Sequence, residues 1–481
     1  MLCPHGDIIL VVFRSPLISS MEKMLMERFS RGKQLIYASG NAGFSLLDSV
    51  FGVYLIFFLI PPKETGMPEL INNTPLFLGL TALGAIIIFG RIVDSLADPL
   101  IAYLSDRSTS RFGRRKFYML TGSLPFALSA CLLFFPPDAS PTVLNAVYVA
   151  VILGIYFFFY TYFMTPYLAL IPELSHTHND RIFITVIQAV FSLLGAALIM
   201  MGVPMLWDSL QTGALDKSLA LKVSLIIMSA IALVLMIVSA LPVNEKKYSV
   251  SKPADVGLLE SIKMTITNKT FLIYMIPTIL FWFSFHIVRT IIAYYPMVLL
   301  HKDQSFQTIL MVVLFGSAVV CFGIITFISK WVTNKSLMLF GLICFALFMS
   351  ITYYIDTLGD FILTGAYIHM ALLGIPVAIL LVIPNAIIAD ISEVDGHRTG
   401  KNREAMFFGT QGLFMKVNYG IAAAIVSYLF ATFGKDVANP MGVKLSGPVA
   451  GVFSLVGFLI FLLYPQKEVS SELKEIRDEL N

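Results

Sequence analysis

Three ionisable residues recur at helical spacing inside an apolar stretch of this 481-residue chain. Arg91, Asp94 and Asp98 are three and four residues apart, so one face of a helix would carry all three. Ionisable side chains at membrane depth cost about 2.5 kcal/mol each or more, which makes each of them a functional hypothesis. Two carboxylates one turn apart suit a hard monovalent cation, either Na⁺ or a proton. A purely structural ion pair between Arg91 and Asp94 would leave the second carboxylate unpaired.

Further ionisable residues lie deep inside other apolar stretches. Asp48 falls in the first stretch, His286 and Arg289 share one face of the seventh, and Lys416 lies too far into the eleventh to reach an interface easily. A buried arginine suits a carboxylate or a phosphate, whereas His286 could equally be a packing histidine. Amides on neighbouring stretches could add hydrogen bonds: Asn41, Gln188, Asn385 and Asn418.

The composition places these residues in a membrane protein. Hydrophobic residues make up 57% of the chain and charged residues 13%, with a mean hydropathy of +0.82, whereas soluble proteins carry about 25% charged residues. A soluble multidomain enzyme is therefore excluded, and the net charge of +3 is too small to indicate a nucleic-acid partner. The sequence contains no nucleophile–base arrangement and no phosphate-binding glycine loop, so we expect neither an enzyme nor an ATP-driven pump.

Twelve apolar stretches are long enough to cross a bilayer, which takes about 20 residues each. They begin near Ile36, Thr74, Phe117, Val143, Ile182, Leu219, Phe271, Phe306, Ser336, Phe361, Glu404 and Gly447. The sequence predicts an all-α membrane protein with 12 transmembrane helices in two six-helix bundles. The predicted parts are an N-terminal tail (1–33), the first bundle (34–242), a charged linker (243–270), the second bundle (271–465) and a C-terminal tail (466–481).

Most lysines and arginines of the short loops follow even-numbered spans, which predicts that both termini are cytoplasmic. We expect a monomer in a plasma membrane or a bacterial inner membrane. The loop after the second span holds Asp106, Arg107, Arg111, Gly113, Arg114 and Arg115. Its arginines could cap helix C-termini and pair with Asp106, so we predict a cytoplasmic gate loop.

Several motifs together resemble those of one transporter family. They are Arg91-x-x-Asp94-x-x-x-Asp98-Pro99, the basic loop after it, Thr165-Pro166-Tyr167-x-x-Leu170-Ile171-Pro172-Glu173, and Ala389-Asp390 followed by Gly400-Lys401-Asn402-Arg403-Glu404. In this order they resemble the glycoside–pentoside–hexuronide:cation symporters of the major facilitator superfamily. That branch includes the melibiose permeases, and the sodium-dependent lysophosphatidylcholine transporters are close relatives.

The resemblance implies roles for individual residues. Asp94 and Asp98 match the family's cation-binding carboxylates, and Thr161 matches the position of an added hydroxyl ligand. Lys416 matches a lysine that reaches toward these carboxylates and, with Arg91, compensates their charge. Cation binding would compete with this lysine, giving the two states of similar energy that coupling requires. The coupling ion would be Na⁺ or H⁺, with no other cofactor.

The chain departs from the family's sugar-site pattern. The best alignment places Ser45, Met164, Gln188 and Leu381 where sugar-transporting members carry charged or tryptophan side chains. These residues, with Asp48, His286, Arg289 and Asn385, are our candidates for the lining of a substrate cavity. The substrate is a small solute, by family default a sugar or glycoside. An anionic or amphipathic molecule such as a lysophospholipid is the rival, and a non-transporting receptor or scaffold remains an alternative of another class.

Overall fold

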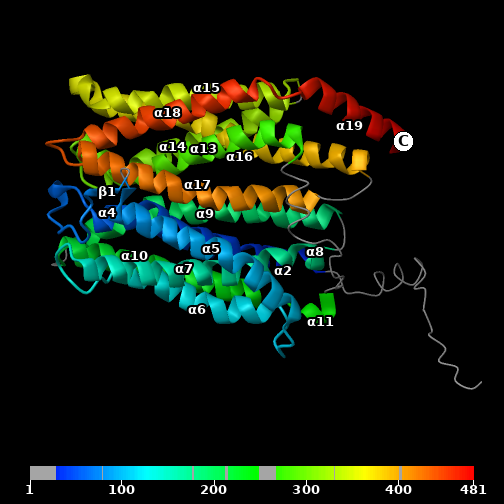
Figure 1. Cartoon of the computed structure of the whole chain (residues 1–481), viewed down its shortest axis with the longest axis horizontal. Helices are drawn as coiled ribbons and strands as arrows, with labels where there is room; N and C mark the ends of the chain where they lie inside the picture. Colours follow the sequence, from blue (N-terminus) through cyan, green and yellow to red (C-terminus); the bar gives the residue numbers. More distant parts are fainter. Residues whose placement is uncertain are drawn as a thin grey trace, which may run out of the picture.

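The computed structural model describes residues 29–77, 80–175, 178–211, 215–248, 267–329, 331–399 and 404–480, and these are nearly all helical (Figure 1). The first set of helices comprises α2 (Arg31–Ala38), α3 (Gly40–Ser49), η1 (Val50–Tyr54), α4 (Leu55–Leu59), α5 (Ala82–Arg107), α6 (Lys116–Leu132), α7 (Val143–Ala169), α8 (Ile171–Leu174), α9 (His178–Gln211), α10 (Lys217–Ala240) and α11 (Glu245–Tyr248). The second set comprises α13 (Lys269–Ile291), η3 (Tyr295–Leu299), α14 (Phe306–Ile328), α15 (Asn334–Ile351), η4 (Thr352–Phe361), α16 (Ile362–Thr399), α17 (Glu404–Phe433), α18 (Met441–Phe461) and α19 (Gln466–Leu480). A short turn η2 (Lys63–Thr65) and a two-stranded hairpin of β1 (Pro75–Phe77) and β2 (Leu80–Thr81) connect α4 to α5.

Five of the described helices begin at an N-cap residue, whose side-chain oxygen accepts a backbone N–H of the first turn. The caps of α5, α7, α10, α13 and α15 are Thr81, Thr142, Asp216, Asn268 and Thr333, with bonds of 3.0–3.3 Å. The second predicted span shows the consequence, because its helix begins at Ala82 rather than near Thr74. The apolar residues before the Thr81 cap belong to the hairpin instead. Hydropathy alone does not distinguish a short apolar strand from the start of a membrane-spanning helix.

Most packing lies within each set of helices. In the first set α7 packs on α5 and α6, and α10 on α3, α6 and α9; in the second, α18 packs on α13 and α15, and α16 on α14 and α15. The two sets meet where α5 contacts α17, α9 contacts α14, and η1 contacts α13. Among the described residues, nine helical stretches are long and apolar enough to cross a membrane, one of them running from Asn334 to Thr399 across α15, η4 and α16. The count of twelve and the domain bounds stay predictions.

A lysine at the start of one helix makes the same backbone contacts in both sets of helices, although the two halves of the sequence show no strong residue-by-residue repeat. Lys116 at the start of α6 donates from Nζ to two carbonyls just past the end of α10, at 3.2 and 2.9 Å. Lys335 at the start of α15 donates to two carbonyls just past the end of α18, both at 2.7 Å. The backbone N–H of each lysine also bonds a side chain that follows, Glu245 or Gln466, at 2.7 and 3.2 Å. Equivalent helices of the two sets are thus fastened in the same way.

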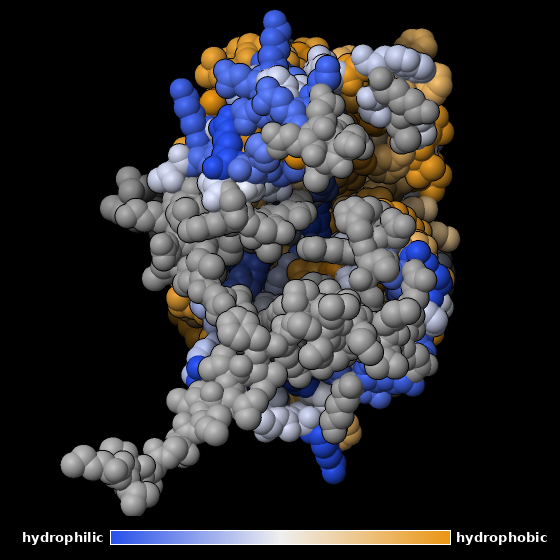
Figure 2. Space-filling model, turned by 90° about the vertical axis from the view of Figure 1, so that its right-hand side faces the viewer, coloured by the Kyte–Doolittle hydropathy of each residue, from blue (hydrophilic) through white to orange (hydrophobic). Residues whose placement is uncertain are grey.

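The molecule has two distinct ends (Figure 1). We call the end that carries α2, α8, α11 and α19 the α19 end, and the opposite end, with α4 and β1, the β1 end. At the β1 end ion pairs join the two sets of helices, with Lys435 Nζ 2.5 Å from Glu69 Oε1 and Lys63 Nζ 3.5 Å from Asp436 Oδ2. Figure 2 looks onto the α19 end and shows a hollow between the two sets.

Candidate functional site

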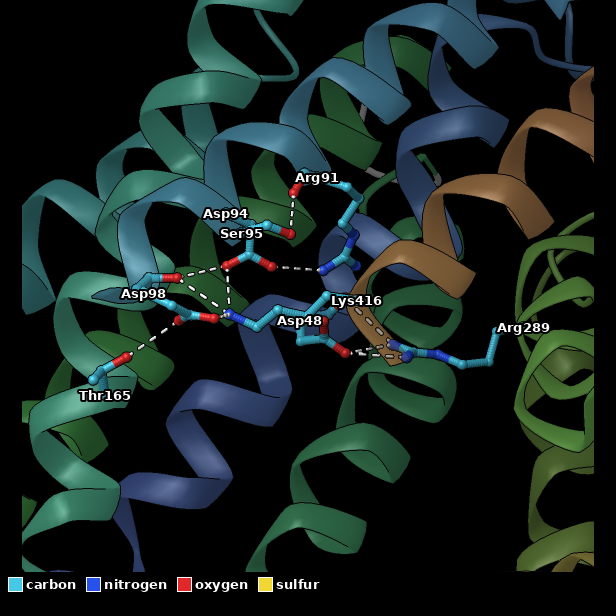
Figure 3. Close-up of polar contacts among 9 residues, drawn as sticks. Asp48, Arg91, Asp94, Ser95, Asp98, Thr165, Arg289 and Lys416 are labelled. Atoms are coloured by element: carbon cyan, nitrogen blue, oxygen red, sulfur yellow. Dashed lines mark hydrogen bonds and ion pairs between the residues drawn. The ribbon is translucent and has the colours of Figure 1, made fainter. Parts of the chain in front are cut away.

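A cluster of ionisable residues lies where α5 and α17 meet (Figure 3). The Nζ atom of Lys416 lies 2.8 Å from Asp94 Oδ1, and 2.9 and 2.8 Å from the two carboxylate oxygens of Asp98. The lysine comes from the second set of helices and both aspartates come from the first. One ammonium group therefore holds the two sets together at this point.

The two carboxylates have different surroundings. Asp94 is fully buried. It accepts a hydrogen bond of 2.5 Å from Thr161 Oγ1 and forms an ion pair with Arg91, whose Nη1 lies 3.3 Å from Oδ2. Asp98 is one-third exposed to the cavity described below, and Thr165 Oγ1 lies 3.4 Å from its Oδ1. We call Arg91, Asp94, Asp98, Thr161 and Lys416 the carboxylate cluster. Its oxygens converge on the position of the ammonium group, where a monovalent cation could replace it.

The described residues contain no group of three or more His, Cys, Asp or Glu side chains that could hold a metal ion. Two carboxylates and a hydroxyl are fewer hard ligands than Ca²⁺ takes, and they are already matched by two basic side chains. The donor set therefore fits a monovalent ion better than Ca²⁺.

The charge of Arg91 is stabilised by aromatic rings as well as by Asp94. Its Cζ atom lies 4.3 Å from the centre of the Phe157 ring, 4.1 Å from that of Tyr419 and 5.4 Å from that of Phe51. The residue is 5% exposed, so these contacts replace water around the guanidinium group.

A second ion pair also joins the two sets of helices. Arg289 of α13 places Nη1 and Nη2 at 3.0 and 3.1 Å from Asp48 Oδ2 of α3, and its Nη2 lies 3.2 Å from Ser49 Oγ. We call Asp48 and Arg289 the cross pair. His286, one turn before Arg289, packs its ring 4.2 Å from that of Tyr419 and 5.9 Å from that of Trp282.

A cavity of about 710 Å³ lies between the carboxylate cluster and the cross pair. The sequence-predicted residues on its wall are Ser45, Asp48, Arg91, Asp98, Met164, His286, Arg289, Leu381 and Lys416. Most of the remaining wall is apolar or aromatic, so a ligand here would meet charge at two places and apolar surface elsewhere.

Two candidates for the cavity lining are misplaced. Gln188 is buried beside α3, where its backbone carbonyl accepts a 2.8 Å hydrogen bond from Asn41 Nδ2, and it does not line the cavity. Asn385 is exposed, is not among the residues of the cavity wall, and donates at 3.3 Å to Leu381 O in the preceding turn. Asn385 is one turn after Leu381 of the cavity wall, so it was predicted on the correct face of α16 but beyond the end of the cavity. Asn418 likewise bonds a backbone carbonyl, Ile279 O, at 2.8 Å.

Aromatic residues on the cavity wall were not singled out from the sequence, among them Tyr160, Trp282, Phe285 and Tyr419. A signal was available, because helical neighbours share a face. Tyr160 stands one turn before Met164, Trp282 one turn before His286, and Tyr419 three residues after Lys416.

The predicted gate loop is held by two glutamates of the first set of helices. Arg114 Nη2 and Arg115 Nη1 each lie 2.6 Å from Glu173 Oε1, and Arg115 also donates to Ala169 O at the C-terminus of α7. Glu245 accepts the backbone N–H groups of Arg114, Arg115 and the next residue at 3.0, 2.8 and 2.7 Å. A carboxylate at the N-terminus of α6 is stabilised by the helix dipole.

The other residues of the loop are placed as follows. Gly113 has φ +111°, and a Cβ atom there would come within 2.7 Å of Glu245 Oε1, so the position requires glycine. Arg107 bonds Tyr103 and Arg111 lies over the Phe112 ring. Asp106 lies in the last turn of α5, and its side chain is outside the described part of the structure.

Comparisons with known proteins agree with this architecture. The family described as "MFS/sugar transport protein" matches residues 36–466. The chain is 22% identical to the uncharacterized symporter sll1374 of Synechocystis sp., covering 92% of this chain and 96% of that protein. It is 30% identical to the putative glycoside/cation symporter YagG of Escherichia coli over 105 residues, covering 21% of this chain and 23% of that protein. A bacterial homologue of the human lysosomal transporter Spinster, solved inward-facing and unoccupied, superposes with a TM-score of 0.64 at 12% identity, covering 92% of this chain and 98% of that one.

The fold and the family match define a multi-pass membrane transporter of the major facilitator superfamily, not an enzyme. The chain belongs to the MFS/sugar transport protein family, in the branch of the glycoside–pentoside–hexuronide:cation symporters. The predicted fold class and the resemblance are thereby confirmed. As in its symporter relatives, a small-molecule substrate and a coupling cation follow from this class.

Proposed function

We propose that this transporter couples the entry of Na⁺ to the uptake of a small organic solute by alternating access. The observation that carries the proposal is the position of the Lys416 ammonium group, within 2.9 Å of both Asp94 and Asp98 and contributed by the opposite set of helices. A cation that takes its place changes the contact between the two sets.

The coupling follows from charge compensation. Without Na⁺, Lys416 neutralises carboxylates that would otherwise be unpaired, one of them fully buried. Na⁺ bound by Asp94, Asp98 and Thr161 supplies the same compensation and releases the lysine from α5. Two arrangements of similar free energy then differ in whether α5 and α17 are joined by an ion pair, and substrate binding selects between them.

The charges around the cavity bear on the substrate. Three carboxylates (Asp48, Asp94 and Asp98) face three basic side chains (Arg91, Arg289 and Lys416), so the formal sum is zero apart from His286. One Na⁺ adds a positive charge. Uptake of a neutral sugar would then carry charge across the membrane, whereas uptake of a monoanion would not.

A sugar or glycoside is the proposed substrate class, in keeping with the names of the family and of YagG. The second candidate is an anionic or amphipathic molecule such as a lysophospholipid. It is favoured by Arg289 on the wall and by the apolar residues Met164, Leu168 and Leu381 where a sugar site needs polar or tryptophan side chains.

We also propose that the α19 end is cytoplasmic, with both termini on that side of a plasma membrane or bacterial inner membrane. The basic gate loop at this end fits the positive-inside rule. When the hollow closes, the loop would contact the second set of helices. A single chain encloses the whole cavity, so a monomer suffices for transport.

The test is ²²Na⁺ binding to purified protein in detergent, with no substrate present. Saturable binding is expected in the native chain and in the control Glu472→Gln, whose carboxylate pairs with Arg398 at the surface. It should be lost in Asp94→Asn/Asp98→Asn. Absence of binding to folded native protein would exclude sodium coupling, and proton coupling or an uncoupled facilitator would then be tested.

The substrate is then sought in proteoliposomes with an imposed Na⁺ gradient. Uptake of a radiolabelled methyl glycoside, with charge movement, would support the sugar class. Uptake of lysophosphatidylcholine, with no methyl glycoside uptake, would support the amphipathic class. Protein that binds Na⁺ but moves no solute in a broad screen would favour the receptor or scaffold.

A further inference from the structure

One aromatic side chain lies between the carboxylate cluster and the cross pair. The Tyr419 ring centre is 4.1 Å from Arg91 Cζ, which pairs with Asp94 in the carboxylate cluster. It is also 5.8 Å from Arg289 Cζ, which pairs with Asp48 in the cross pair. The same ring therefore contacts Arg91 of the carboxylate cluster and Arg289 of the cross pair.

Tyr419 is linked to the carboxylate cluster in two ways. It stands on α17 three residues after Lys416, so a movement of that lysine's helix turn moves the tyrosine as well. It also receives the face of the Arg91 guanidinium, whose Nη1 lies 3.3 Å from Asp94 Oδ2. A cation bound to Asp94 would alter both contacts.

The Tyr419 ring packs tightly against η1 on one side and lines the cavity on the other. Tyr419 is 6% exposed, its ring packs 5.3 Å from that of Phe51, and a Cβ atom at Gly52 would come within 2.3 Å of its hydroxyl oxygen. Both neighbours belong to η1, a π-helical turn, and such turns occur often at functional sites. On the cavity side the ring lies 4.2 Å from that of His286. A displacement of the ring therefore changes the cavity wall and its contact with His286.

We propose that Tyr419 is a positioning residue that transmits the state of the cation site to the substrate cavity, an inference that rests on the proposed symport. When the cation releases Lys416 and draws Asp94 from Arg91, the Tyr419 ring shifts against His286 and Arg289. The cross pair and the adjacent cavity wall then take the arrangement that binds substrate. The face of the ring carries this contact, so phenylalanine can replace tyrosine and an aliphatic side chain cannot.

The experiment needs no identified substrate, because Trp282 reports on the cavity. Its indole lines the wall and packs 5.9 Å from the His286 ring. Tryptophan fluorescence is followed during a titration with NaCl at constant ionic strength, and the part of the response that Trp282→Phe removes is taken as the cavity signal. Binding of ²²Na⁺ is measured on the same preparations. The variants are Tyr419→Leu, Tyr419→Met as a second aliphatic choice should the first fail to fold, and Tyr419→Phe as the matched control.

The native chain and Tyr419→Phe should show a saturable cavity signal at the Na⁺ concentrations that fill the site. The aliphatic variants should bind Na⁺ within about threefold of the native affinity and lose at least four-fifths of the signal amplitude. An unchanged amplitude in the aliphatic variants would overturn the proposal, as would loss of their Na⁺ binding or a native chain that binds Na⁺ without a signal.

Failure of the proposed function gives a different result. If the native chain binds no Na⁺, sodium coupling is wrong, and the same variants are compared after a downward pH step. A Trp282 response that needs an aromatic residue at position 419 would then support the transmission with H⁺ as the ion, and a response equal in all variants would refute it.

Discussion

The Lys416 ammonium group is proposed to compete with Na⁺ for the carboxylate cluster and to stabilise the protein when Na⁺ is absent, and its removal tests both effects. Lys416→Met keeps most of the side-chain volume and takes away the hydrogen bonds to Asp94 and Asp98 at 2.8–2.9 Å. In the proposed cycle Na⁺ must displace these bonds, so the variant should bind Na⁺ more tightly. A hydrogen bond to a charged group contributes about 1.5–3 kcal/mol net. If displacement costs one such interaction, the dissociation constant for Na⁺ falls roughly 10- to 100-fold.

The same variant should be less stable without sodium. Asp94 has no exposed surface, and removal of one partner of a buried ion pair costs about 3–5 kcal/mol. The Tm in choline chloride should therefore fall, and NaCl should raise it more than in the native chain, because a ligand that binds the folded state stabilises it. The control is Lys444→Met, which removes a lysine of similar burial that pairs with Asp356 within the second set of helices.

The assay is ²²Na⁺ binding with a Tm measurement on each preparation. A dissociation constant in Lys416→Met that is equal to or weaker than the native value, in protein that elutes as a single species, would refute displacement of the lysine by the cation. A Tm that NaCl raises equally in both lysine variants would refute it as well.

Three further substitutions test other parts of the structure. Gly52→Ala should lower the Tm, since its methyl group would come within 2.3 Å of a tyrosine hydroxyl and overpacking costs about 1–3 kcal/mol; Gly316→Ala, which meets nothing within 4 Å, should not, and equal Tm values would contradict the close contact. Lys435→Gln breaks the 2.5 Å pair with Glu69 and should speed labelling of a cysteine placed in the cavity by a membrane-impermeant reagent added on the β1 side; an unchanged rate would show that this pair does not hold that end shut. Glu245→Gln should increase hydrogen exchange at the backbone amides of Arg114, Arg115 and Lys116, because a neutral side chain loses the interaction with the dipole of α6; unchanged protection would argue against the cap.

The sequence was most informative where charged residues stand inside a stretch that should be apolar. The spacing of Arg91, Asp94 and Asp98 in an apolar stretch identifies a charged helix face, because such a stripe is expensive in a membrane. The approach of Lys416 has no such local signal. Its partner Asp98 is 318 positions away in the chain, and only the family resemblance indicated the contact that the structure contains.

Other features were beyond the reach of pattern and propensity. Tyr419 and Trp282 look like packing aromatics because apolar helices are rich in them, and their meaning depends on which neighbours face the same cavity. Gln188 and Asn385 were chosen as polar residues, but the Asn385 side chain bonds a backbone carbonyl of its own helix and Gln188 is buried beside α3. The start of α5 depended on the Thr81 cap, which an average of hydropathy does not register.

The matching lysines at the starts of α6 and α15 bear on how such a chain arose. Lys116 and Lys335 bond equivalent carbonyls and differ in the residue beside them, a glutamate in one half and a glutamine in the other. Halves that have diverged in most side chains yet keep the same fastening are what duplication and fusion of a six-helix ancestral gene would leave. The carboxylate cluster differs from these contacts, because Lys416 comes from one half and both aspartates come from the other, so neither half forms the cluster alone. In a fused gene each half therefore keeps two different constraints, a lysine that joins its own helices and a share of a site that neither half forms alone.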